Sequence, residues 1–339
     1  MNILNGTAIG VVVVLIPGAL LSELCKGLAD LIPQMSLVLN ALNMSSSLMG
    51  VVCGIAIGMR FGFAPLESLS LGLATQVASG SLVFKNGSTL LSGTGDIINI
   101  ILTGSAGAFV ILLIGSRLKS FKLLVIPPLL LAVIGVFGFL LYPEVSQITA
   151  WIGLGVKQLL VLQPELMAVL LAEIFSLLVL SPITTVGIAL AVSLAGLGSG
   201  AANLGICAAG FGYAVMGWNV NPHGTSLAMF IGSPKMALPV VVRNFKTFVP
   251  IAANAALMGF LGYFLNIQGT PMSAGFGVSG LVGPLNHINL AKGGFDPANI
   301  FVALLAFIVV PILLAFLFKY IFTRLIPIVS EEDYQLDVL

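Results

Sequence analysis

Long apolar stretches recur along the whole chain, and short segments rich in Gly, Pro, Asn and basic residues separate them. A helix needs about 20 residues to cross a hydrocarbon core about 30 Å thick, and these stretches approach or reach that length. They do not alternate between apolar and polar residues, and lipid cannot satisfy an open backbone, so helices are predicted rather than barrel strands. The stretches are residues 8–21, 38–59, 97–114, 123–141, 166–180, 183–197, 201–215, 247–265 and 300–322.

The predicted fold class is therefore all-α, a polytopic transmembrane helical protein with about 10 to 12 spans. The composition agrees, since 58% of the residues are hydrophobic and 7% are charged, against about a quarter charged in an ordinary soluble domain. Two segments do not fit a spanning helix: residues 269–294 are apolar but rich in glycine and proline, and residues 79–99 are a shorter, polar counterpart. We expect re-entrant hairpins at both, because a membrane tolerates a broken helix where protein or water covers the backbone.

An internal repeat divides the chain. The sequence RLKSFKLLVIPPLLLAVIGVFGFLLY, from residue 117, aligns with VVRNFKTFVPIAANAALMGFLGYFLN, from residue 241, at a constant offset of 124. Each copy begins with a basic turn and continues as an apolar stretch with matched glycines, and transporters built from such repeats bind substrate between them. Whether the halves are parallel or inverted stays open. The expected parts are a first transmembrane half, residues 1–147, a second, residues 148–329, and a short acidic tail, residues 330–339.

Charge and motifs exclude several classes of function. A net charge of +1 provides no electrostatic basis for binding nucleic acid, so none is expected as a partner. The three cysteines are far apart among apolar or small residues and form neither a disulfide framework nor a metal signature. No phosphate-binding loop, catalytic triad pattern or zinc-protease motif is present. We therefore expect no catalytic residues, no metal and no cofactor in this chain, and a lipid bilayer around it.

Both histidines of the chain lie among asparagines and beside helix-breaking residues. Asn and neutral His supply donors as well as acceptors, as the hydroxyls of a sugar require, and a buried polar group left unpaired costs about 1–3 kcal/mol. The pattern favours a polar binding site, although two interfacial loops would use the same turn-forming residues. The predicted substrate-binding residues are Asn219, Asn221, His223, Thr225, Asn286, His287 and Asn289.

Acidic residues within apolar stretches form a second group of candidates. Glu173 lies in LMAVLLAEIFSLLVL, and a carboxylate at membrane depth is costly and usually functional, so it is either a coupling acid or a protonated packing residue. Asp96 is either a second coupling acid or the first residue of a helix. At the offset of 124, Asn99 corresponds to His223, so the first half would present Asp96 and Asn99. Lys235 either meets an anion or extends to lipid headgroups, and we favour the headgroups.

Two segments carry a resemblance to a known family: NPHGTSLAMFIGSPKMALPVVVRNF, from residue 221, and GFGVSGLVGPLNHIN, from residue 275. They resemble the EIIC membrane components of bacterial sugar phosphotransferase systems, in the branch that also holds proteins described as toxin-gene regulators. The resemblance covers about residues 42–322. It implies a multi-pass permease of the bacterial plasma membrane, a homodimer, which moves sugar by alternating access while a IIB partner phosphorylates the sugar from a phosphocysteine.

This chain departs from that scheme, because it holds no IIA or IIB domain and no cysteine in a soluble module. It could therefore phosphorylate sugar only with separate IIA and IIB subunits, or it transports without phosphorylation. Family members bind sugar with a Glu and a His of the second half; His223 or His287 matches in type, but no Glu stands beside either. We expect a permease of a small hydrophilic solute, most readily a sugar. The alternative is a membrane-embedded sensor or regulatory protein that binds a ligand without transporting it. The acidic tail could dock a partner, although we favour a solvated segment.

Overall fold

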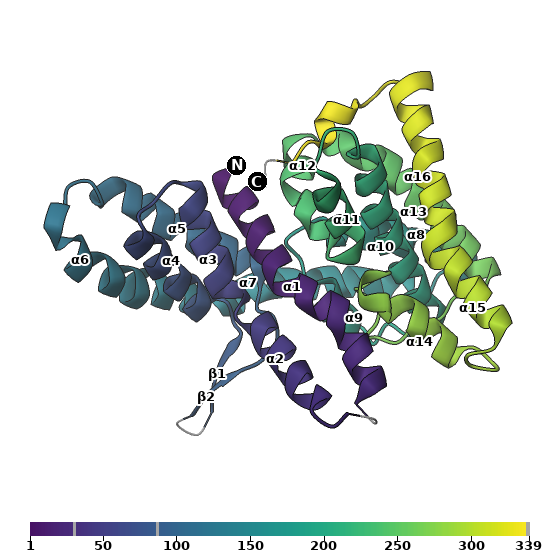
Figure 1. Cartoon of the computed structure of the whole chain (residues 1–339), viewed down its shortest axis with the longest axis horizontal. Coiled ribbons are helices and arrows are strands. Elements are labelled where there is room, and N and C mark those ends of the chain that lie inside the picture. Colours follow the sequence, from purple (N-terminus) through teal and green to yellow (C-terminus); the bar gives the residue numbers. More distant parts are fainter. Residues whose placement is uncertain (30–31, 86–87, 337–339) are drawn as a thin grey trace. The chain divides into compact units, whose positions relative to one another are not determined.

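The computed structural model describes residues 1–29, 32–85 and 88–336, and these residues are mainly helical (Figure 1). They divide into two compact units, Met1–Ile148 and Thr149–Leu336, each with its own buried core. The all-α class of a multi-pass membrane protein is confirmed. Strands occur only as one short hairpin in the described part of the chain.

In the first unit, helix α1 packs on α3, and α3 packs on α4. Small residues allow the close approach: a Cβ added at Gly58 would lie 2.7 Å from the Cα of Ser68. The elements of this unit are α1 (Asn2–Leu28), α2 (Met35–Ser47), α3 (Met49–Arg60), α4 (Pro65–Ala78), β1 (Leu82–Lys85), β2 (Ser88–Leu91), α5 (Ile97–Ile114), η1 (Lys119–Phe121), α6 (Lys122–Leu129) and η2 (Leu130–Gly135), with α7 (Val136–Leu159) continuing into the second unit.

Residues 79–99, expected as a re-entrant hairpin, contain instead an antiparallel β-hairpin. Strand β1 pairs with β2 in the register Leu82↔Leu91 and Lys85↔Ser88, and all of β2 is exposed. The sequence explains the strands. Residues 82–85 include β-branched and aromatic residues, and the Asn-Gly that follows them is the strongest short-range hairpin signal. Residues 82–85 and 88–91 therefore pair as two strands and do not form a helix.

In the second unit, α10 is the central helix, and it packs on α8, α13 and α16. Gly205 of α10 lies against the backbone of Ala172, where a side chain would collide with the Ala172 carbonyl. The elements are α8 (Pro164–Val179), α9 (Thr185–Ala191), α10 (Gly196–Met216), α11 (His223–Ile231), η3 (Pro234–Ala237), α12 (Leu238–Arg243), η4 (Phe245–Phe248), α13 (Val249–Phe264), η5 (Ser279–Leu281), α14 (Val282–Leu290), α15 (Pro297–Leu304), η6 (Leu305–Val309), α16 (Val310–Tyr320), η7 (Ile321–Leu325) and η8 (Glu331–Tyr334).

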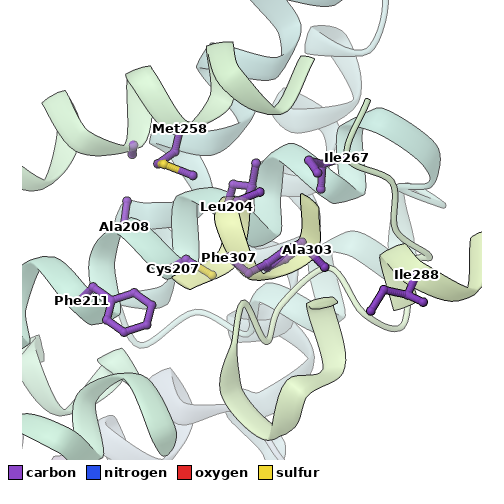
Figure 2. Close-up of a cluster of buried hydrophobic side chains, with 11 residues drawn as sticks. Leu204, Cys207, Ala208, Phe211, Met258, Ile267, Ile288, Ala303 and Phe307 are labelled. Carbon is purple, nitrogen blue, oxygen red and sulfur yellow. The ribbon is translucent and has the colours of Figure 1, made fainter. Parts of the chain in front are cut away.

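The core of this second unit is apolar along one side of α10 (Figure 2). Phe307 is fully buried, and Leu204, Cys207 and Phe211 of α10 share its cluster with Met258 of α13. Burial of apolar area contributes roughly 25 cal/mol per Å² when the reference is water. In lipid that gain is smaller, so close packing of small residues and internal hydrogen bonds matter more.

The number of spans differs from the expectation. Within the described residues, four helical segments are long and apolar enough to cross a membrane, and a pair bent by 52° makes a fifth if it counts as one span. This is fewer than the predicted 10 to 12, in part because Pro and Ser interrupt residues 166–215, so that α8 has only 16 residues and α9 only 7. The segments are Ile97–Ile114, Lys119–Leu159, Phe245–Phe264 and Pro297–Leu325, with Met35–Ser47 and Met49–Arg60 as the bent pair.

The two basic turns of the sequence repeat have similar local structure. Each forms a 3-10 turn, η1 in one copy and η4 in the other, and each leads directly into an apolar helix, α6 or α13. A common ancestry of the two halves stays a prediction.

Candidate functional site

The glycine-rich loop of residues 268–281 lies inside the second unit, where α10 holds it. Ser199 Oγ donates to the carbonyl of Thr270 at 2.8 Å, and Asn203 Oδ1 accepts from the backbone N–H of Gly277 at 3.0 Å. Both side chains are fully buried. Because they are four residues apart on one helix, they face the same side of α10, and together they anchor a backbone that has no helix to satisfy it.

Two further contacts hold the start and the middle of the loop. Gly269 and Gly196 exchange backbone hydrogen bonds of 2.8 and 3.0 Å at the start of α10, and Thr185 of α9 donates to the carbonyl of Gly275 at 3.3 Å. Gly277 has a φ of +59°, which favours glycine. Groups on α9 and α10 therefore bind this irregular backbone, which a membrane tolerates where protein surrounds it.

His287 borders the loop from α14. Its Nδ1 accepts a hydrogen bond of 3.2 Å from the backbone N–H of Gln268, and the residue is 4% exposed. An imidazole that accepts at Nδ1 carries its proton on Nε2, so this His is neutral and presents one donor. Its ring is 6.3 Å from that of Phe307. Of the neighbouring asparagines, Asn289 is exposed, whereas the buried Asn286 Oδ1 has no hydrogen-bond partner among the described residues.

The other predicted group surrounds the turn between α10 and α11. Asn219 is exposed and donates to Glu331 at 2.6 Å, and the buried Asn221 binds the backbone of residues 334–336. His223, exposed at the start of α11, stacks on Trp218 with ring centroids 4.8 Å apart. Thr225 follows on α11 and is half-buried.

The structure does not bring these two groups together. His287 lies beside Gln268 and hence at the N-terminal end of α10, whereas Asn219 and Asn221 follow its C-terminal end. With 21 residues in α10, the two ends are about 30 Å apart.

The remaining predicted residues lie apart from both groups. Glu173 is half-buried on α8, and its carboxylate has no hydrogen-bond or ion-pair partner among the described residues. Asp96 is the N-cap of α5 and accepts from the backbone N–H of Asn99 at 3.0 Å. Burial raises the pKa of the Asp96 carboxyl, and the backbone hydrogen bonds from Asn99 and Ile98 oppose that shift. Of the two interpretations of Asp96, the structure shows the helix-start role, because its carboxylate caps α5.

Asn99 is fully buried and joins two helices of the first unit. Its Nδ2 donates to the carbonyl of Ala78, at the end of α4, at 2.6 Å, and to that of Gly138, on α7, at 2.9 Å. Its Oδ1 has no partner among the described residues. Asn99 therefore connects helices, and one acceptor stays open.

Lys235 occupies a position different from the expected one. Its side chain is buried at 8% exposure, and Nζ donates to the carbonyls of Ser181 and Ile183 at 2.8 and 2.6 Å. These carbonyls lie in the break between α8 and α9, so Lys235 satisfies free backbone acceptors instead of extending to headgroups.

The chain matches a known family model over almost its full length. That model is described as "Phosphotransferase system, EIIC" and covers residues 1–336. The chain belongs to this EIIC family. No curated protein matches it, and no solved structure does either. The family match and the apolar helices together show that this EIIC protein is a multi-pass membrane component of a phosphotransferase system.

Sequence reasoning overlooked the anchors of the loop. Ser199 and Asn203 interrupt the apolar stretch of α10 at a spacing of four residues, which is a signal for one polar helix face. Thr185 gave no comparable signal, because its partner Gly275 lies 90 residues away in the chain. Within the described residues, no group of three or more His, Cys, Asp or Glu could hold a metal ion.

Proposed function

We propose that this EIIC protein is the permease of a sugar phosphotransferase system, and that it moves a small hydroxylated solute by alternating access. The observation that carries the proposal is the partly buried, glycine-rich loop 268–281, held by Ser199 and Asn203 and bordered by His287. Transporters bind substrate where helices are broken inside the membrane, because the freed backbone groups and nearby side chains can receive a polar ligand.

The ligand site is proposed around α14 and the loop. Asn286 offers a buried acceptor without a partner among the described residues, and the neutral His287 offers a donor at Nε2. This mixture of donors and acceptors suits sugar hydroxyls, each of which donates and accepts. Of the seven predicted substrate-binding residues, we retain Asn286, His287 and Asn289 for the ligand, and Glu173 as the candidate coupling acid. A homodimer in the bacterial plasma membrane, served by separate IIA and IIB subunits, completes the proposal.

Transport is tested by uptake of labelled sugars into proteoliposomes, with and without a IIB subunit charged with phosphate. Uptake that requires the charged subunit supports coupled phosphorylation, and uptake without it supports an uncoupled permease. If a sugar binds but no flux occurs in either case, the membrane-embedded sensor replaces the permease.

The site is tested by Asn286→Ala, which removes an acceptor that has no partner among the described residues. We expect unfolding to change little and sugar affinity to fall about tenfold or more, the effect of one lost hydrogen bond to a buried ligand. His223→Ala is the control, since that ring is exposed at the other end of α10. Unchanged affinity in Asn286→Ala would remove α14 from the site.

A further inference from the structure

The acidic segment of residues 330–336 lies against the second unit in a groove that buries Tyr334, while Ser330, Glu332 and Gln335 stay exposed. Tyr334 is fully buried, its ring centroid is 5.4 Å from that of Tyr213, and its hydroxyl donates to the carbonyl of Thr247 at 2.9 Å. Aromatic anchors of this kind dominate the affinity of peptide interfaces. The segment is therefore attached through a specific side chain.

The groove also binds the backbone of the segment. Asn221 donates to the carbonyl of Tyr334 at 3.0 Å and accepts from the N–H of Leu336 at 2.8 Å, so one amide side chain pairs with the peptide on both sides of Gln335. Nη2 of Arg243 donates to the carbonyls of Asp333 and Gln335, both at 2.9 Å. These side chains bind the backbone of the segment as a neighbouring β-strand would, and grooves that bind extended peptides use the same kind of backbone hydrogen bond.

Charge complementarity adds selectivity. Lys319 forms an ion pair of 3.1 Å with Glu331, Asn219 donates to the same carboxylate, and Asn244 donates to Asp333 at 3.0 Å. Exposed pairs of this kind are worth little singly, and they favour an acidic peptide over a basic one. The side chain of Glu332 is exposed.

We infer that residues 330–336 form a detachable latch, and that the groove lined by Asn221, Arg243, Tyr213 and Thr247 is a binding site for this acidic, Tyr-containing peptide. The latch joins the end of η7, which follows α16, to the turn after α10 and to the basic turn before α13. Its release frees the side chains of Asn221 and Arg243 from the peptide backbone and frees the end of α16. This inference concerns the opposite end of α10 from the proposed sugar site and does not depend on it.

The experiment uses a variant that lacks residues 330–339 and a fluorescein-labelled peptide, SEEDYQLDVL, read by fluorescence anisotropy. We expect the peptide to bind this variant at least about tenfold more tightly than the full chain, whose groove is occupied. Replacing Tyr334 by Ala in the peptide, or Asn221 by Ala in the protein, should weaken binding about tenfold or more. Asn40→Ala, at an exposed position on α2 of the first unit, is the matched protein control.

A pair of peptides separates specific contacts from charge. Asp333→Asn and Glu332→Gln each remove one negative charge, but only Asp333 contacts Asn244 and Ser330. We expect the first to weaken binding and the second to leave it nearly unchanged. Equal binding of all peptides, or no binding to a truncated variant that still unfolds cooperatively, overturns the inference.

Cleavage of the full chain provides a second measurement if the truncated variant does not fold. A Glu-specific protease cuts after Glu331 and Glu332, and its rate follows the population of the released latch. Asn221→Ala should be cut about tenfold faster than the unmodified chain. Equal rates would show that Asn221 does not hold the latch.

Discussion

The two Asn/His groups of the second unit have nearly the same residues and opposite environments. At the α14 end, His287 is buried, is neutral and accepts from Gln268. At the α11 end, His223 is exposed and stacks on Trp218. A residue type therefore indicates what a position could bind, whereas burial and partners decide what it does.

The asparagines differ in the same way. Asn221 uses both of its amide donors and one acceptor position of Oδ1 on backbone groups, two of them in residues 334–336, so its side chain is already engaged in the latched state. Asn286 retains a buried acceptor without a partner among the described residues. Only the second condition suits a ligand site, because an unpaired buried acceptor gains most from a ligand hydroxyl.

The largest contrast is expected between two glycines near these groups. Gly277→Ala places a side chain at a φ of +59°, with its Cβ 2.8 Å from Ile206 Cγ2, and should cost about 2–4 kcal/mol of unfolding free energy. Gly224→Ala meets nothing within 4 Å on α11, so it should be neutral or stabilise by up to about 1 kcal/mol. Denaturant titration in detergent measures both. A Gly277→Ala loss no larger than that of Gly224→Ala would contradict the close packing of the loop.

The two histidines provide the next contrast. His287→Ala leaves the N–H of Gln268 without its acceptor and should lower the unfolding free energy by about 1–3 kcal/mol. His223→Ala changes an exposed position and should stay within about 0.5 kcal/mol. Thermal unfolding followed by intrinsic fluorescence compares them, and the same result for both would remove the distinction between the groups.

A smaller effect is expected at the latch. Tyr334→Phe removes the hydroxyl that donates to Thr247 and should cost about 0.5–1.5 kcal/mol of docking, measured as faster cleavage by the Glu-specific protease. Tyr320→Phe, at a side chain that is 57% exposed on α16, is the control and should have no effect. Identical cleavage rates for the two variants would show that the buried hydroxyl contributes nothing.

The smallest effect is expected when the pH is lowered, and it concerns the affinity of the latch. The backbone N–H of Ser330 lowers the pKa of Asp333, and Asn244, the Ser330 hydroxyl and Arg243 lower it further, while partial desolvation opposes them. A carboxylate whose docked pKa is depressed stabilises docking above its free pKa of about 3.9. Latch affinity should therefore be constant near neutrality and fall only below about pH 4. Peptide anisotropy across pH checks this, and the fall should be smaller with the Asp333→Asn peptide, in which only the ion pair of Glu331 with Lys319 still responds to acid.

Much of the architecture was predictable, because the membrane constrains it through local properties. Apolar stretches with few charges predict helices wherever lipid surrounds them, and glycine and proline indicate where the loop 268–281 departs from a long helix. Asp96 as a helix-start residue was also readable, since an N-cap bonds to a backbone N–H only three residues away.

The contacts of the candidate site were not predictable to the same degree. The sequence indicates that Asn221 can pair with backbone, but its partner Leu336 lies 115 residues away. Gln268 meets His287 across 19 residues and Asn203 meets Gly277 across 74. No periodicity within a helix encodes such pairs.

By itself the sequence determined that this chain is a helical membrane protein with polar residues gathered where helices break, because those properties follow from composition and local patterns. The tertiary structure decided which polar residues meet: it placed the two histidine groups at opposite ends of α10, filled one with the chain's own acidic segment, and left a buried acceptor open in the other. The physical reason is that hydrogen bonds form over about 3 Å, and only packing brings residues far apart in the chain to that distance.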